Sequence, residues 1–391
     1  MTPRTGTAPE RLEALTGLRF LAAFHVVLFH VSHWERWPGP AAFRHVAGAG
    51  YIAVGLFFML SGFVLTYTRG GDGSARESRA PFYAARFARI YPVYLLALLL
   101  AFPFALRPAL AHGGSGRLLA EGLATTTLLQ AWHPGLALAW NAPGWSLSVE
   151  AFFYAAFPFL APRLVTLSVR RTLAVMAGAL ALLLTLPLAY ALGSPEGWSA
   201  RYDSEGFWLD VLRYHPLVRL PEFLLGIGLA RLYAHPPLRT SVARHAGLLA
   251  TTAAALLLGV LALGPRVPYV LLHNGLLAPA FAVLLLALAT GEGLPARLLR
   301  HPWAVRLGEA SYSLYILHIP LLMVSRSVAS HVLGREVLDT PAFLAGFLVL
   351  AVSTSLASHR LVEQPLNHRL RRAFASLRTR GPGTSTTRPI P

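Results

Sequence analysis

Long apolar stretches recur along the whole chain, and they limit what it can fold into more than any other feature. Each has about 17 to 25 residues, enough for a helix to cross a bilayer. Backbone groups in lipid must bond internally, so only helices and closed barrels span a membrane. A barrel needs alternating segments of about ten residues, whereas these runs are continuous. The pattern therefore predicts an all-α, polytopic integral-membrane helical bundle.

Composition agrees with this fold class and removes several kinds of chemistry. The chain is 55% hydrophobic and 13% charged, with a mean hydropathy of +0.52. It has no cysteine, which excludes disulfides, thiolate metal sites and a cysteine nucleophile. All 34 basic residues are arginine, so a lysine Schiff base is also excluded. The sequence has no metal-binding HExxH motif, no Walker loop, no dinucleotide fingerprint and no Gly-x-Ser-x-Gly elbow.

The distribution of the arginines predicts topology rather than nucleic-acid binding. The apolar stretches predict ten spans, at approximately 15–34, 51–68, 90–107, 143–161, 172–192, 216–233, 246–264, 271–290, 308–330 and 342–360. With the N-terminus inside, 23 arginines fall in inside segments and seven in outside segments. Cytoplasmic loops carry such an excess of arginine. We therefore expect a multi-pass protein of the cell membrane with both termini in the cytoplasm.

The chain is predicted to have one transmembrane domain, residues 1–366, followed by a tail, residues 367–391. The tail is basic at first and then rich in Gly, Ser, Thr and Pro, a composition typical of disorder. We expect it to be a disordered cytoplasmic segment.

Two ionisable residues share one face of the first predicted span. Arg19 and His30 are eleven residues apart, which places them within roughly 20° around a helix and roughly 16 Å apart along it. Ionisable residues inside a membrane are costly and usually functional. An imidazole titrates near neutrality, so His30 is a candidate general base for an attacking hydroxyl. The alternative is a polar side chain that is merely hydrogen-bonded within the bundle.

A second group of polar residues begins the fourth predicted span. Ser146, Glu150 and Tyr154 follow one another at intervals of four residues and so form one stripe on a helix. Glu150 lies in the outer half of its span, as His30 does in span one. We expect the carboxylate to orient the imidazole and stabilise its protonated form. The alternative is a structural ion pair of Glu150 with Arg19, Arg219 or another membrane arginine.

Paired arginines precede the third span. Arg86 and Arg89 lie one helical turn apart at its cytoplasmic end. Arginine pairs suit the phosphates of a nucleotide-like donor. Ordinary anchoring of the span at the cytoplasmic surface is the alternative.

Other polar residues in the later spans have mainly structural interpretations. Arg219 and Glu222 are three residues apart and are expected to pair. His318 is a further intramembrane imidazole, close to a helix-kinking Pro320. The segment from His359 to Glu363 is expected to hold an ion pair.

Several short motifs occur in order at comparable positions on the ten spans. They are Leu-Thr-Gly-Leu-Arg19 with His30, Gly55-Leu-Phe-Phe-Met-Leu-Ser-Gly-Phe63, Arg86-Phe-Ala-Arg-Ile-Tyr-Pro92, Gly144-Trp-Ser-Leu-Ser-Val-Glu150, Leu307-Gly-Glu-Ala-Ser-Tyr-Ser-Leu-Tyr-Ile-Leu-His318 and Glu363-Gln-Pro365. Together they resemble the membrane acyltransferase 3 family over approximately residues 15–365.

The resemblance implies transfer of an acyl group, commonly from acyl-CoA, to a hydroxyl of a sugar, a polysaccharide or a macrolide. It implies that acyl-CoA is a co-substrate, that the protein binds no cofactor, and that the protein is embedded in the lipid bilayer. By motif match, its site residues are His30 and Glu150 for catalysis, Arg19, Arg86 and Arg89 for the donor, and Ser146, Tyr154 and His318 in support. Many relatives carry Asp in a Gly-Val-Asp-Leu-Phe-Phe motif, where this chain has Ala53-Val-Gly-Leu-Phe-Phe58. The role of that acid cannot be transferred to Gly55.

Two other classes of function remain open. A transporter would use His30, Glu150 and His318 to move a metabolite or protons, although the repeated halves and broken helices of many transporters are not evident here. A structural membrane subunit would not need polar residues aligned at matching depth.

Overall fold

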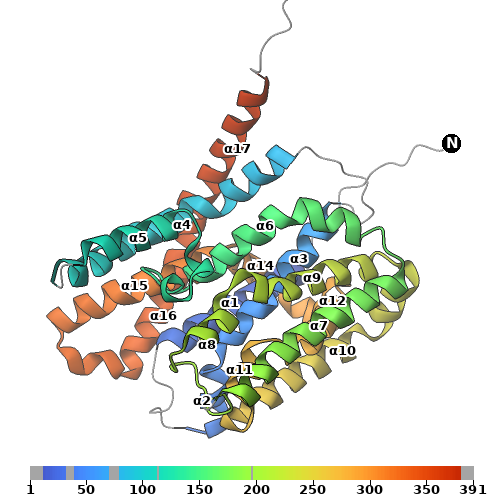
Figure 1. Ribbon diagram of the computed structural model, residues 1–391, viewed down its shortest axis with the longest axis horizontal. Helices are drawn as coiled ribbons and strands as arrows, with labels where there is room; N and C mark the ends of the chain where they lie inside the picture. Colours follow the sequence, from blue (N-terminus) through green and yellow to red (C-terminus); the bar gives the residue numbers. More distant parts are fainter. Residues whose placement is uncertain (1–11, 32–38, 70–78, 112–113, 195–196, 380–391) are drawn as a thin grey trace, which may run out of the picture.

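The protein is a bundle of helices, seen in a computed structural model that describes residues 12–31, 39–69, 79–111, 114–194 and 197–379 (Figure 1). These residues contain no β-strand, so the all-α membrane fold is confirmed. The long helices are α1 (Glu13–Val31), α3 (Ala53–Thr68), α4 (Arg79–Ala111), α6 (Gly144–Leu164), α7 (Val169–Gly193), α9 (Pro216–Tyr233), α10 (Pro236–Ala262), α12 (Ala278–Ala289), α15 (Ser311–Val332), α16 (Pro341–Ser358) and α17 (Gln364–Thr379).

The remaining helices and turns form the connections. They are α2 (Ala41–Ala47), α5 (Ser115–Thr126), α8 (Phe207–Tyr214), α11 (Tyr269–His273), α13 (Gly293–Leu299), α14 (Pro302–Glu309), the 3-10 turns η2 (Gly50–Ile52), η3 (Gln130–Trp132), η4 (Pro134–Leu136), η5 (Gly264–Arg266) and η6 (Arg335–Asp339), and the π-turn η7 (His359–Glu363). Several helices begin with proline as their first residue, where its missing N–H costs nothing, including α9, α10 and α16. Thr340 also caps α16 by accepting a hydrogen bond from the Phe343 N–H at 3.2 Å.

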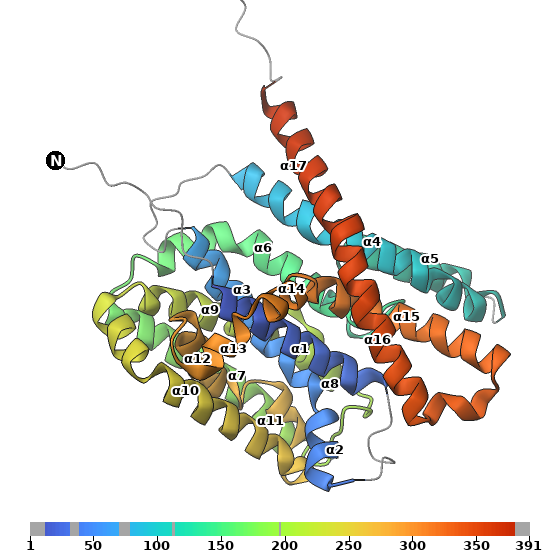
Figure 2. The ribbon, with the colours of Figure 1, turned by 180° about the vertical axis from the view of Figure 1, so that it is seen from behind.

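Helices α1 and α3 run through the middle of the bundle (Figure 2). On one side α9 packs on α3, α7 on α9, and α12 on α10, while on the other α15 contacts α1, α4 and α16. Glycines permit the closest of these contacts, as is common between membrane helices. A methyl group on Gly226 of α9 would lie 2.0 Å from the Met59 carbonyl oxygen of α3, and one on Gly62 would lie 2.3 Å from the Phe223 oxygen.

Among the described residues, eight helical segments are long and apolar enough to cross a membrane. All ten predicted spans are helical, but α6 and α9 are not among those eight. Buried polar and charged residues lower their hydropathy, including Ser146 and Ser148 in α6 and Arg219 and Glu222 in α9. The count of ten and the cytoplasmic position of both termini stay predictions.

The structure refines one local prediction and corrects another. The span predicted at 271–290 is present as Tyr269–Ala289, long and apolar enough to cross a membrane, and it is interrupted between α11 and α12, where Gly275 adopts a φ of +104° that suits glycine. The tail predicted to be disordered from residue 367 is helical up to Thr379, because α17 continues from α16 through η7 and packs on α4. Phe374 contacts Phe87 of α4, with ring centroids 6.4 Å apart. The predicted disorder of 380–391 lies outside the described residues.

Candidate functional site

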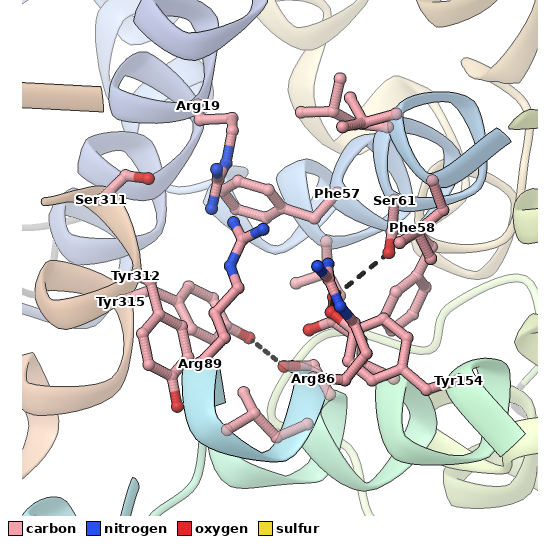
Figure 3. A pocket seen from close by; sticks show the side chains of 17 residues that line it. Arg19, Phe57, Phe58, Ser61, Arg86, Arg89, Tyr154, Ser311, Tyr312 and Tyr315 are labelled. Carbon is pink, nitrogen blue, oxygen red and sulfur yellow. Dashed lines mark hydrogen bonds between the residues drawn. The ribbon is translucent and has the colours of Figure 1, made fainter. Parts of the chain in front are cut away.

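A cavity of about 100 Å³ lies in the middle of the bundle (Figure 3). Helices α1, α3, α4, α6 and α15 each supply part of its wall. The lining residues are Arg19, Val54, Phe57, Phe58, Leu60, Ser61, Val64, Leu65, Arg86, Arg89, Ser146, Leu147, Glu150, Tyr154, Ser311, Tyr312 and Tyr315. Six of the eight residues predicted for the site are in this set; His30 and His318 are not.

The three arginines assigned to the donor converge on this cavity from two helices. Arg19 comes from α1, and Arg86 and Arg89 come from successive turns of α4. Figure 3 shows Arg19 and Arg89 pointing toward one another, with Arg86 beside Tyr154. The Nε atom of Arg86 has no hydrogen-bond partner among the described residues. Like charges held this close repel one another, so the arrangement favours an anion between them.

Glu150 lies in the same cavity as the arginines. Its Oε1 accepts hydrogen bonds from the Tyr154 hydroxyl, one turn later on α6, and from Ser61 of α3 at 3.2 Å. The predicted contact with His30 is therefore not formed: no hydrogen bond joins the two among the described residues. The prediction relied on similar depth in the membrane, which does not fix the direction in which each helix face points.

Ser146 and Tyr315 form the end of the cavity farthest along α6 from Tyr154. Their side-chain oxygens are 2.7 Å apart, and Figure 3 draws this bond. The Ser146 hydroxyl also donates to the Pro143 carbonyl at 2.9 Å. Ser146, Glu150 and Tyr154 thus share one face of α6, as predicted. Tyr315 was missed, because a tyrosine in an apolar helix gives no signal that distinguishes a cavity wall from the core.

His30 and His318 contact each other directly. Nδ1 of His30 lies 3.1 Å from Nε2 of His318, and the ring centroids are 5.0 Å apart. His30 is half-buried in the last turn of α1, whereas His318 of α15 is fully buried. His318 is connected to the cavity wall through Tyr315, whose carbonyl oxygen lies 2.7 Å from its Nδ1. The partner of the imidazole is thus another imidazole, 288 residues away in the sequence.

A wider vestibule of about 570 Å³ adjoins the cavity. The two share Arg19, Val64 and Arg89, so they meet at the arginines. The other lining residues are Leu12, Glu13, Leu15, Thr16, Tyr67, Thr68, Val305, Glu309, His359, Glu363, Gln364, Asn367 and Arg371. Arg371 and Asn367 belong to α17. Sequence reasoning missed both, because it treated residues from 367 onward as a disordered tail.

The ion pair expected near the end of α16 is confirmed. His359 Nδ1 and Glu363 Oε2 are 3.1 Å apart, and Ser313 of α15 donates to the same carboxylate oxygen at 2.9 Å. These contacts fix the π-turn η7 against α15 and so set the direction in which α17 leaves the bundle.

The predicted pair of Arg219 and Glu222 is also confirmed, and it explains the missing acid at Gly55. The two side chains are buried and 2.6 Å apart. Arg219 further donates to the His273 carbonyl at 2.9 Å, next to the break between α11 and α12. A methyl group on Gly55 would lie 2.9 Å from Glu222 Oε1. The Glu222 carboxylate thus fills the space where a side chain at residue 55 would begin.

Comparison with known proteins identifies the family of the chain. A family model described as an acyltransferase domain, acyltransferase 3, matches residues 12–360. The chain belongs to this family and is a membrane acyltransferase. Acyltransferase MdmB of Streptomyces mycarofaciens is 31% identical over 372 residues, covering 91% of each chain. O-acetyltransferase OatA of Staphylococcus aureus is 22% identical over 393 residues, covering 95% of this chain and 59% of OatA. No solved structure matches significantly.

Proposed function

We propose that this protein is an O-acyltransferase of the cell membrane that moves an acyl group from acyl-CoA to a hydroxyl of a sugar, a polysaccharide or a macrolide. The observation that carries the proposal is the convergence of Arg19, Arg86 and Arg89 on one cavity inside an apolar bundle. Three guanidinium groups carry more positive charge than the one carboxylate of Glu150 in the same cavity, so they favour an anionic ligand, because burying like charges together is costly.

The donor fits the order of the two cavities. The wide vestibule receives the nucleotide end, whose phosphates bind Arg19 and Arg89 where the cavities meet. Arginine forms bidentate bonds with phosphate oxygens, which suits this role. The narrower cavity then receives only the acyl end of the donor, between apolar residues such as Phe57 and Phe58.

His30 acts on the acceptor. Its imidazole takes the proton from the attacking hydroxyl, and the hydroxyl oxygen forms a bond to the thioester carbonyl carbon. The carbon–sulfur bond then breaks, CoA leaves as a thiolate, and the proton held by His30 passes to that thiolate. Glu150 has a different role from the one expected: it balances the charge of the arginines and holds Tyr154 and Ser61 in place.

Purified protein in lipid nanodiscs, given acetyl-CoA labelled in the acetyl group and candidate acceptors, tests the proposal. We expect acceptor-dependent release of CoA and a labelled ester product, both lost in His30→Ala. Arg107→Ala is a suitable control, since Arg107 is exposed on α4 and lines neither cavity. Proteoliposomes that accumulate the candidate acceptor without acylating it, at a rate sensitive to His30→Ala, would support the transporter and overturn the proposal.

A further inference from the structure

The hydrogen-bond directions around His30 follow from the groups it contacts. Nδ1 of His318 lies 2.7 Å from the Tyr315 carbonyl oxygen. A carbonyl only accepts, so this nitrogen carries a hydrogen. In a neutral imidazole the other nitrogen, Nε2, then has no hydrogen and is an acceptor. His318 therefore offers a lone pair to its neighbour.

The same argument applies to His30. Its Nδ1 lies 2.9 Å from the Val26 carbonyl oxygen and 3.1 Å from His318 Nε2. Both neighbours accept, so Nδ1 of His30 carries the hydrogen and donates to them. Its Nε2 is left with a lone pair, since both bonds that His30 makes to described residues go to Nδ1.

We infer that His318 is a positioning residue that, together with the Val26 carbonyl, holds His30 in the tautomer with a basic Nε2, and that the His30–His318 pair is the proton-accepting unit of the enzyme. The inference rests on the proposed function. His318 cannot be the base itself, because it is fully buried and both its ring nitrogens are engaged. When Nε2 of His30 takes a proton, the bond from Nδ1 to His318 becomes charge-assisted and stabilises the imidazolium.

Substitutions at His318 separate an acceptor role from mere packing. Glutamine places its side-chain oxygen at the level of Nε2, asparagine reaches only the level of Nδ1, and leucine offers no acceptor. We expect His318→Gln to keep kcat within about tenfold of the wild type, and His318→Asn and His318→Leu to lose roughly 100-fold. The donor KM should change by less than about threefold, since His318 does not line the donor cavity.

A packing role would instead lower the activity of the glutamine and asparagine variants equally. That result, or a His318→Leu enzyme with kcat within about threefold of the wild type, would overturn the inference. If His318→Leu does not fold, the comparison of kcat between His318→Gln and His318→Asn still distinguishes an acceptor role from a packing role.

The tautomer can also be measured without turnover. Protein labelled with ¹⁵N-histidine reports which ring nitrogen carries hydrogen, and the difference from His30→Gln assigns the His30 signal. We expect the Nδ1–H form in the wild type and in His318→Gln, and a smaller fraction of that form in His318→Leu, where only the Val26 carbonyl still accepts the hydrogen. An Nε2–H form in the wild type would refute the inference. Because this readout does not depend on acyl transfer, it remains decisive even if the proposed function fails.

Discussion

The two ionisable site residues of α1, Arg19 and His30, have separate functions that follow their position along the helix. Arg19 faces the junction of the cavity and the vestibule, while His30 lies near the other end of the helix with His318. Binding of the charged donor and transfer of the proton therefore take place at different depths in the membrane. This division predicts that substitutions at the two levels affect different kinetic constants.

Removing a donor arginine should weaken donor binding with little effect on the chemical step. We expect Arg89→Ala to raise the KM for acetyl-CoA by roughly 10- to 100-fold, the loss of one or two charge-assisted hydrogen bonds, with kcat changed less. Steady-state kinetics in nanodiscs measure this, with Arg107→Ala on the same helix as the control. A fall in kcat at unchanged KM would assign Arg89 to the chemistry instead.

At the scale of the helices, α17 shows how an element outside the predicted transmembrane domain reaches the site. Arg371 lines the vestibule, whereas Arg372, its neighbour, does not. Both are exposed, so neither is needed for the core.

We expect Arg371→Ala to raise the donor KM several-fold, with a smaller effect at higher salt, because an exposed charge acts through a screened potential. Arg372→Ala, which removes the same charge from the same helix, should leave KM unchanged. Equal effects of the two variants would indicate general attraction by the basic helix rather than a defined contact.

The α3–α9 contact depends on the absence of side chains. A methyl group on Gly226 would lie 2.0 Å from the Met59 carbonyl oxygen, so the helices would have to separate. We expect Gly226→Ala to destabilise the protein by about 1–3 kcal/mol, the usual cost of overpacking. Thermal unfolding in detergent measures this. Gly178→Ala on α7 is the matched control, since Gly178 has no atom near the added methyl, and it should be neutral or slightly stabilising.

At the scale of the whole molecule, the size of the inner cavity sets a limit on the acyl group. A volume of about 100 Å³ between Phe57, Phe58 and Leu60 suits an acyl group of a few carbons. We expect kcat/KM to be at least about tenfold higher for acetyl-CoA than for octanoyl-CoA.

A series of acyl-CoA donors of increasing length measures this preference. Phe57→Ala enlarges the cavity and should shift the preference toward longer chains. If octanoyl-CoA is the better donor for the unmodified protein, the acyl group binds elsewhere.

The sequence by itself determined the membrane fold, since backbone groups in lipid leave almost no alternative to helices for apolar runs of this length. It also determined which residues share a helix face, because the helical repeat fixes this: Ser146, Glu150 and Tyr154 line the cavity together, as do Arg86 and Arg89. The pairs within one helical turn, Arg219 with Glu222 and His359 with Glu363, follow from the same local geometry.

Only the tertiary structure decided which faces meet. Similar depth in the membrane suggested that Glu150 would contact His30. The rotation of α6 and α15 about their axes instead brings His318 against His30, while Glu150 accepts hydrogen bonds from Ser61 and Tyr154. The order of α17 was likewise decided by tertiary structure. The sequence predicted a disordered tail, but this segment is a helix whose Phe374 contacts Phe87 of α4. Helical periodicity acts within a segment, whereas rotation and partner choice depend on side-chain packing between segments far apart in the chain.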